Sequence, residues 1–306
     1  MKKSKIYVFS HTESISKEYD VMTESLNQGS YGVVRQCVMK DTNEVFAVKT
    51  ILKKEVHKCQ QIRNEVLILK LLSHPNVMEL TAIYENETSV HIVTPYYPGG
   101  DLFEEFIRRK RFKKGGPPFL EQEASSFTKQ MLSAISYCHS QGVVHRDVKM
   151  ENFVLRTQIS GTELVLIDFG LSKKKDSARK YLTTCVGTPH YMAPEVIARR
   201  YTHTCDIWSI GIILYVMLCG HFPFDARDEL ELALQIRYTE ISFPKRQWTG
   251  LSSESKDLIQ VLLCKSKIKR PSAKQALCYP WFSLSEMRRN SISKLASKFS
   301  CKSINL

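Results

Sequence analysis

The distribution of apolar residues divides the chain into two parts of different character. In the first part, short apolar stretches bounded by turns predict strands that begin at Tyr19 and recur at residues 45–49, 77–84 and 90–94. Residues 60–72 instead space their apolar side chains as an amphipathic helix does, and the sequence SHPN at residues 73–76 ends that helix. The pattern therefore predicts a β-rich region that contains one helix.

The character changes at residues 95–100, whose sequence PYYPGG interrupts regular structure. Beyond it, apolar residues predict buried or half-buried helices at residues 127–139, 207–219 and 255–264. The longest apolar run, residues 210–219, is too short to span a bilayer and is typical of a buried helix. Residues 113–118 have the composition of a surface loop. A β-rich region followed by a larger helical region predicts an α+β fold.

The charge of the chain favours acidic partners only weakly. The 306 residues carry a formal net charge of +13, from 44 basic and 31 acidic side chains. The basic clusters are scattered along the chain and do not form one block. A solvated surface with some attraction for acidic partners is therefore favoured, and no nucleic-acid interface is expected.

The cysteines and the first residues bear on the compartment. The nine cysteines include no C-x-x-C pair, and their number is odd. This spacing argues against a zinc site and indicates reduced thiols, so we expect a cytoplasmic or nuclear location. The opening sequence, MKKSKIYVFSHTES, has no apolar segment long enough for a signal peptide, and Lys2 excludes N-myristoylation. We therefore expect no stable membrane anchor.

Two polar motifs in the second part carry the candidate chemistry. The sequence HRDVKMEN occupies residues 145–152, and DFG occupies residues 168–170. Carboxylates and an amide presented on loops are suited to Mg²⁺, which prefers oxygen ligands and keeps some positions for phosphate. In a phosphoryl transfer, Asp147 would accept the proton of the attacking hydroxyl and Lys149 would meet the γ-phosphate. Asn152 and Asp168 would ligate the metal.

Two charged residues of the first part complete this set. Lys49, on a predicted strand, would reach the α- and β-phosphates of a nucleotide, and Glu65, on the predicted helix, would hold that lysine in place. Each residue alone is more often a helix cap or a surface charge. The ordered occurrence of all of them is what favours phosphoryl transfer.

The ordered motifs resemble the signature of eukaryotic protein kinases. They are a glycine loop at residues 26–34, AVK at 47–49, the helical Glu65, HRDVKMEN, DFG, and APE at 193–195. The resemblance covers about residues 19–282 and implies a bilobal kinase fold, with ATP and Mg²⁺, or Mn²⁺ as a substitute, as cofactors. It implies an N-lobe at about 19–94, a hinge at 95–98 and a C-lobe at 99–282. Residues 1–18 are expected to be flexible, and residues 283–306 form a basic tail.

Within that family the chain is similar to the calcium/calmodulin-dependent group, above all to the catalytic domains of calcium-dependent protein kinases. The resemblance rests on HPNVMEL (74–80), YYPGGDLF (96–103), YCHSQGVVHRDVK (137–149), CDIWSIGIILYVMLCGHFPF (205–224) and RPSAKQALCYPWF (270–282). No EF-hand pattern follows these motifs. The tail is either a fragment of an autoinhibitory or calmodulin-binding helix or a frayed end, and a frayed end is favoured. Calmodulin and an upstream kinase are candidate partners.

The resemblance also implies a nucleotide-binding set. Residues of the glycine loop would cover the phosphates, namely Leu26, Asn27, Gln28, Gly29, Ser30, Tyr31 and Gly32. Leu26, Val34, Ala47 and Val154 would enclose the adenine, with Thr94 behind it, and Pro95 and Tyr97 would offer it a carbonyl and an N–H. The cofactor-binding set also takes in Lys49, Asp101, Glu151 and Asp168.

Asn27 stands where the family pattern has its first glycine. We interpret this as tolerated, because that position needs an unusual backbone angle and asparagine accepts positive φ better than other non-glycine residues. Lys49, Asp147 and Asp168 are all present, which favours an active enzyme. The alternatives are a pseudokinase that acts as a nucleotide-binding scaffold, and a catalytic fragment of a longer calcium-regulated kinase.

Substrate and regulatory residues follow from the same resemblance. Lys149 with Thr188 matches the Ser/Thr pattern, and Asp101 and Glu151 would bind an arginine three residues before the target. Three further residues would line a pocket for an apolar residue after the target: Cys185, Pro189 and Met192. Val216 occupies the position of a glutamate that reads a second arginine in some relatives. The expected substrates are therefore proteins with the motif R-x-x-S/T.

Regulation is expected in the activation segment, residues 168–195. Thr184 matches the usual phosphorylation site, with Thr183 as the second candidate, and its phosphate would pair with Arg146. Glu195 and Arg270 are expected to form a structural ion pair, and Asp206 is expected to brace the catalytic loop.

Overall fold

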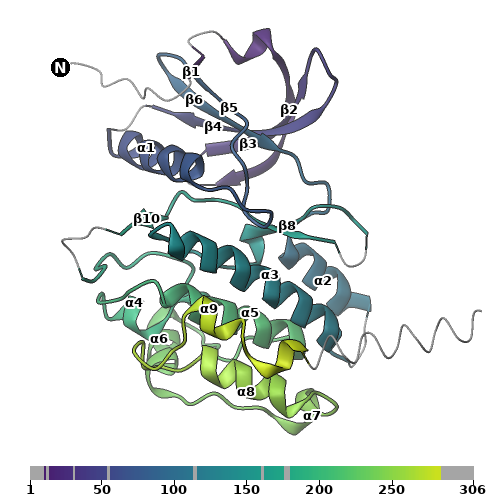
Figure 1. Ribbon diagram of the computed structural model, residues 1–306, viewed down its shortest axis with the longest axis vertical. Helices are drawn as coiled ribbons and strands as arrows, with labels where there is room; N and C mark the ends of the chain where they lie inside the picture. The colour runs from purple at the N-terminus through teal and green to yellow at the C-terminus, as the bar shows by residue number, and fades with distance from the viewer. Residues whose placement is uncertain are drawn as a thin grey trace, which may run out of the picture.

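A sheet and a helical region lie one above the other in the computed structural model (Figure 1). It describes residues 10–11, 14–29, 32–53, 56–112, 116–159, 162–175 and 180–283; within these, the side chains of residues 10–11, 27–29 and 56–61 are not described. The structure confirms the predicted α+β class.

The upper region is a six-stranded sheet with the order β1-β5-β6-β4-β3-β2. Five strands are antiparallel, and the short β1 (Ser10–His11) pairs with β5 in parallel. The antiparallel strands are β2 (Tyr19–Gly29), β3 (Gly32–Met39), β4 (Val45–Leu52), β5 (Ala82–Glu85) and β6 (Ser89–Pro95). Helix α1 (Val56–Leu71) lies beside the sheet, where a helix was predicted, but it begins four residues earlier (60 − 56 = 4).

The strand predicted at residues 77–84 is largely wrong. Only Ala82–Glu85 is a strand, and Val77 makes a single bridge to Leu166 in the helical region. The N–H of Met78 donates to the carbonyl of Leu166 at 2.9 Å, and the Asn76 amide donates to the carbonyl of Leu164 at 2.8 Å. The start of this segment is extended because it bonds to the helical region, and the segment reaches the sheet at Thr81, whose N–H donates to the carbonyl of Val93 at 2.9 Å.

Packed structure also begins before residue 19. Residues Ile15–Lys17 form a 3₁₀ turn, η1, capped by the hydroxyl of Ser14. The Ile15 side chain is buried in a small cluster with Tyr19 and Tyr84. The part of the expected flexible segment that precedes residue 10 lies outside the described residues.

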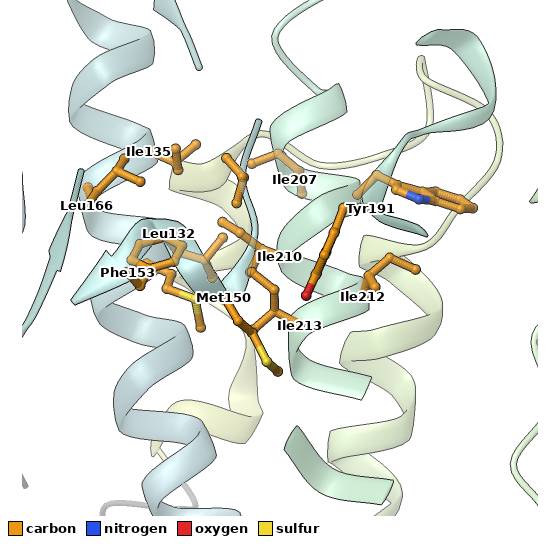
Figure 2. Close-up of a cluster of buried hydrophobic side chains, with 14 of the residues drawn as sticks. Leu132, Ile135, Met150, Phe153, Leu166, Tyr191, Ile207, Ile210, Ile212 and Ile213 are labelled. Atoms are coloured by element: carbon orange, nitrogen blue, oxygen red, sulfur yellow. The ribbon is translucent and has the colours of Figure 1, made fainter. Parts of the chain in front are cut away.

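The lower region is built around α5 (Cys205–Cys219), which is buried along nearly its whole length. Gly220, with φ of 86°, ends this helix in the left-handed conformation that glycine adopts at low cost. The other helices are α2 (Leu102–Phe112), α3 (Glu121–Ser140), α4 (Pro194–Ile197), α6 (Glu229–Tyr238), α7 (Lys245–Trp248), α8 (Ser253–Leu262) and α9 (Ala273–Ala276). Figure 2 shows Leu132 and Ile135 of α3 facing the isoleucines of α5, with Phe153 and Met150 beside them. The three predicted helices are confirmed, although α3 begins earlier, at Glu121.

Two short two-stranded sheets between the regions present the polar motifs. β7 (Val143–Val144) pairs with β10 (Lys173–Lys174), and β8 (Phe153–Leu155) pairs with β9 (Leu164–Leu166). The HRDVKMEN loop joins β7 to β8 and includes the 3₁₀ turn η2 (Met150–Asn152), whereas the DFG loop joins β9 to β10. A further 3₁₀ turn, η3 (Pro189–Tyr191), precedes α4. Because β7, β8 and β9 are largely buried, the HRDVKMEN loop is fixed at both ends and the DFG loop at the end that follows β9.

Two observations on the described part of the chain concern membrane-spanning helices and cysteine pairing. None of its helices has the length and apolar character needed to cross a membrane. The cysteines whose side chains the structure describes are unpaired thiols: Cys37, Cys138, Cys185, Cys205, Cys219, Cys264 and Cys278.

Candidate functional site

The glycine loop is the end of the β2–β3 hairpin. Gly29 lies opposite Gly32, and Asn27 lies opposite Val34 in a paired extended strand. The described non-glycine residues with positive φ are Asn43, Arg146, Asp168 and Arg199. The backbone argument for Asn27 was therefore wrong, because a paired strand position does not require a left-handed residue. Ser30 and Tyr31 lie outside the described residues, as do the side chains of Asn27 and Gln28.

Gly32 is required by the sheet itself. Its φ is 141°, and a Cβ there would lie 2.5 Å from the carbonyl oxygen of Thr50 on β4. A larger residue would push β3 away from β4, on which Lys49 stands. This glycine thus positions the lysine as well as the loop.

The expected adenine residues lie on strands of the sheet and on β8 of the helical region. Ala47 of β4 lies opposite Thr94 of β6, and Phe46 lies opposite Pro95. The N–H of Gly99 donates to the Leu155 carbonyl at 3.1 Å, so the chain after Tyr97 is tied to β8, which carries Val154. Leu26 on β2 is 47% exposed, as expected of a residue at an open edge.

Lys49, on β4 of the sheet, bonds to helix α1 and to the DFG loop. Its Nζ donates to Oε1 of Glu65 on α1 at 2.7 Å and to Oδ1 of Asp168 at 3.2 Å. Burial alone would lower the pKa of Lys49, but the two carboxylates together raise it above its ordinary value. The lysine therefore stays charged at every physiological pH.

One oxygen of the Asp168 carboxylate accepts hydrogen bonds from two separate donors. The φ of Asp168 is 58°, and its Oδ1 also accepts from the N–H of Gly170 at 3.2 Å. Burial opposes ionisation, but Lys49 and that N–H hold the pKa of Asp168 below its usual range. Phe169 is fully buried, with its ring 5.1 Å from that of His145, and this packing fixes the loop.

The catalytic-loop residues form a closed network. Oδ1 of Asp147 accepts from the backbone N–H and from the hydroxyl of Thr188, at 3.0 and 2.9 Å. The Lys149 ammonium lies 3.1 Å from Oδ2 of Asp147 and donates to the Thr188 hydroxyl at 3.2 Å. The activation segment approaches this closely because Gly187 has φ of 119° and a Cβ there would lie 2.7 Å from the Arg146 carbonyl.

Asn152 is oriented so that its oxygen is available. Its Nδ2 donates to the backbone carbonyl of Asp147 at 2.8 Å, and no described donor bonds its Oδ1. Oδ2 of Asp168 also has no hydrogen-bond partner among the described residues. One amide and one carboxylate oxygen fit a divalent cation that takes further ligands from phosphate. No cluster of three His, Cys, Asp or Glu ligands occurs in the described part of the chain.

Asp206 braces the loop, as expected. Its carboxylate accepts from the N–H groups of His145 and Arg146, both at 2.9 Å, and from Nε2 of His139 at 2.8 Å. Burial opposes ionisation, but the His139 ring keeps the pKa of Asp206 below its ordinary value. The sequence analysis missed His139; the available signal was a polar residue at the end of an otherwise buried helix face.

The expected substrate residues fall into two groups. Asp101 accepts from the N–H of Glu104 at 2.8 Å, so it also caps α2. Burial and nearby carboxylates, Glu151 among them, raise the pKa of Asp101. Glu151 has a buried Oε2 without a hydrogen-bond partner among the residues that the structure describes. In the second group Cys185 is exposed, whereas Pro189 is the first residue of η3 and Met192 directly follows it.

The ion pair expected between Glu195 and Arg270 is confirmed. The two terminal guanidinium nitrogens of Arg270, Nη1 and Nη2, donate to the Glu195 carboxylate, and Nη2 lies 3.0 Å from Oε2. The same guanidinium donates to the carbonyls of Thr204 at 2.9 Å and Cys264 at 3.0 Å. The pair thus joins α4 to the segments around α5 and α8.

Comparison with known proteins identifies the family. A family model described as "Protein kinase domain" matches residues 21–282, so the chain belongs to the protein kinase family. It is 33% identical over 291 residues to calcium-dependent protein kinase 5 of Plasmodium falciparum, covering 95% of this chain and 50% of that protein. It is 38% identical over 266 residues to calcium/calmodulin-dependent protein kinase type 1 of Macrobrachium nipponense, covering 86% and 74%.

A fungal relative gives the same result. The calcium/calmodulin-dependent protein kinase cmkB of Emericella nidulans is 39% identical over 264 residues, with 84% of this chain and 64% of that protein covered. The chain spans about half the length of the calcium-dependent relatives that it matches. The resemblance to this group of kinases is confirmed.

Proposed function

We propose that the chain transfers the γ-phosphate of Mg·ATP to serine or threonine residues of proteins. The observation that carries this is the Lys49 ammonium, which bonds both Glu65 and Asp168 and so joins the sheet to the loop beside Asp147. Phosphoryl transfer needs aligned groups and neutralised charge more than covalent chemistry. The described residues supply both.

Each of this chain's groups has one task. Asp147 orients the attacking hydroxyl and accepts its proton, and Lys149 contacts the γ-phosphate. Lys49 holds the α- and β-phosphates, while Glu65 fixes Lys49. Asn152 and Asp168 would hold Mg²⁺, or Mn²⁺, which supplies neutralisation of the charge on the phosphoryl group. Support for a Ser/Thr target comes from the Thr188 hydroxyl, which bonds both Asp147 and Lys149.

Substrate selection would rest on unpaired negative charge. The buried Oε2 of Glu151 has no hydrogen-bond partner in the described part of the chain, and Asp101 is near enough for Glu151 to contribute to its raised pKa. A guanidinium three residues before the target would satisfy both carboxylates. An apolar residue after the target would lie against Cys185, Pro189 and Met192.

Phosphorylation of Thr184, or of Thr183, by an upstream kinase would add to this activity. Both side chains are exposed and accessible. Arg146 would supply the positive charge, although its Nε already donates to the Leu171 carbonyl at 2.6 Å. Calmodulin is a further proposed partner, because relatives of this chain carry that dependence in their names.

The second candidate is a kinase-like scaffold that binds nucleotide without transfer. The test is transfer of labelled phosphate from Mg·ATP to an R-x-x-S peptide, with calcium–calmodulin and with chelator. Transfer in both conditions supports a self-contained kinase, and transfer only with calcium–calmodulin supports the regulated fragment. Nucleotide binding without any transfer, also after treatment with an upstream kinase, would support the scaffold.

A further inference from the structure

Tyr181, in the activation segment, lies among positively charged side chains. The Lys267 ammonium is 4.4 Å from the centroid of its ring, the Arg200 guanidinium 4.6 Å, and the Lys180 ammonium 5.7 Å. Arg200 precedes α5 and Lys267 follows α8, so the ring joins three separate parts of the chain. None of the motifs in the sequence pointed to this cluster.

The Tyr181 ring stabilises the three nearby positive charges through cation–π interactions. In the part of the chain that the structure describes, no carboxylate forms an ion pair with Lys180, Arg200 or Lys267. The Lys267 ammonium bonds the backbone carbonyl of Arg200, which brings the two like charges together. The negative face of an aromatic ring attracts cations, so Tyr181 offsets the repulsion that this arrangement creates.

Backbone and side-chain bonds continue from the ring toward the catalytic loop. Leu182 and Tyr201 exchange two backbone hydrogen bonds, of 2.9 and 3.1 Å. The Tyr201 hydroxyl donates to the carbonyl of Thr184 at 2.7 Å and accepts from Nη1 of Arg146 at 3.4 Å. The segment from Tyr181 to Thr184 is thereby attached to the helical region without any phosphate.

The attachment determines where Thr188 lies. Only three residues, 185–187, separate Thr184 from Thr188, and Thr188 bonds Asp147 through both its N–H and its hydroxyl. If the start of this short segment were released, Thr188 and the wall of the substrate pocket at Pro189 would lose their fixed position. ATP contacts on the sheet would be unaffected.

We propose that Tyr181 is a positioning residue whose ring, held by Arg200 and Lys267, keeps the activation segment in its substrate-binding form without phosphate on Thr184. The inference rests on the proposed function and deepens it by assigning a basal, phosphate-independent activity. Phosphate on Thr184 then increases an activity that already exists.

The test compares Tyr181→Phe, which keeps the ring, with Tyr181→Leu, which removes it, both in a chain that also carries Thr183→Val and Thr184→Val. We expect the Phe variant to match its parent. We expect the Leu variant to raise the KM for the peptide about tenfold, the order of one or two cation–π contacts, with the KM for ATP unchanged. Lys267→Gln should reproduce part of this effect, whereas Lys269→Gln, an equal charge change at an exposed neighbour, should not.

A measurement that does not depend on activity accompanies the kinetics. Hydrogen exchange at the amides of Leu182 and Tyr201 should be faster in the Leu variant and unchanged in the Phe variant. Equal exchange in all three chains would overturn the inference, and so would a Phe variant as impaired as the Leu variant. If the parent with both valines transfers no phosphate but the unsubstituted chain does after treatment with an upstream kinase, the basal activity and with it the inference fail. If neither chain transfers phosphate, the proposed function fails, and exchange alone then decides whether the ring holds the segment.

Discussion

Two ion pairs in this chain use the same chemistry in different surroundings. The Lys49 ammonium is shared between carboxylates from two elements, and the side chains of Lys49 and Asp168 are 18% and 38% exposed. The Arg270 guanidinium binds a single carboxylate, that of Glu195, with 0% and 7% exposure. The first pair is open to a ligand on one side, whereas the second is closed to water.

The two pairs differ in whether another hydrogen-bond acceptor can replace the carboxylate that binds each cation. Phosphate oxygens can replace a carboxylate as partners of Lys49, because an ammonium imposes little geometry on its acceptors. Arg270 has a planar group whose nitrogens bond Glu195, Thr204 and Cys264 together, and nothing in its surroundings can replace them. One pair is therefore suited to a functional site and the other to permanent support of the fold.

The largest effect is expected on the closed pair. Glu195→Gln should lower the free energy of unfolding by about 3–5 kcal/mol, because it leaves the Arg270 charge buried and unpaired. Chemical denaturation measures this change. The exposed pair Arg156–Glu163 provides the control, since Glu163→Gln should cost no more than about 1 kcal/mol. Similar losses for the two variants would show that burial is not what distinguishes them.

Substitution in the open pair, Lys49 with Glu65 and Asp168, should reduce activity more than stability. Lys49→Met should reduce kcat/KM at least about 100-fold, because a preorganised charge on the phosphates is lost. Its effect on unfolding should be smaller than that of Glu195→Gln, and both are measured on the same preparations. A variant that loses stability without losing activity would reverse the assignments of the two pairs.

The same variant has a pH dependence of known sign. Without Lys49, burial leaves the pKa of Glu65 raised in the folded chain. A carboxyl with a raised folded pKa binds more protons when folded, so its ionisation lowers stability as pH increases through that pKa. The stability that Lys49→Met loses relative to the parent should therefore increase as pH rises above about 4.5, the ordinary pKa of a glutamate. A Lys49→Met, Glu65→Gln double variant should lack this increase.

The Glu151 carboxylate should determine how strongly the chain prefers peptides with an arginine before the target serine. Glu151→Gln should lower kcat/KM about tenfold for a peptide with arginine three residues before the serine, the order of one charge-assisted hydrogen bond. A peptide with alanine there should be unaffected. Glu231→Gln, on the exposed side of α6, serves as the matched control. Equal losses for both peptides would place Glu151 outside arginine recognition.

The smallest effect concerns His203, which lies beside the Asp206 brace. Burial, with His139 and Lys175 nearby, lowers the pKa of His203 to about 4. Between that value and the ordinary one of about 6.5, the unfolded chain binds more protons, so stability falls as pH decreases through this interval. The unfolding temperature of His203→Gln should consequently fall less than that of the parent between about pH 7 and about pH 5. Parallel curves would show that His203 does not contribute.

The sequence predicted these regions unevenly, for physical reasons. Helix α5 and both ion pairs were foreseen, because a long apolar run and ordered charged motifs are properties of the sequence itself. The bonding of residues 76–78 to β9, the His139–Asp206 bond and the Tyr181 cluster were not foreseen. Each depends on segments far apart in the chain, and a cation near a ring leaves no local pattern. The argument about Asn27 failed because strand pairing, and not the loop, sets its backbone angle.

The central claim is that Asp147 is the group that acts on the substrate hydroxyl. The most direct measurement compares the chain with Asp147→Asn, both for phosphate transfer from labelled Mg·ATP to an R-x-x-S peptide and for nucleotide affinity. We predict that transfer falls at least about a thousandfold while nucleotide affinity stays within a few-fold, because Asn cannot accept the proton but preserves the shape of the loop. Transfer by the Asn variant at the rate of the parent would contradict the account.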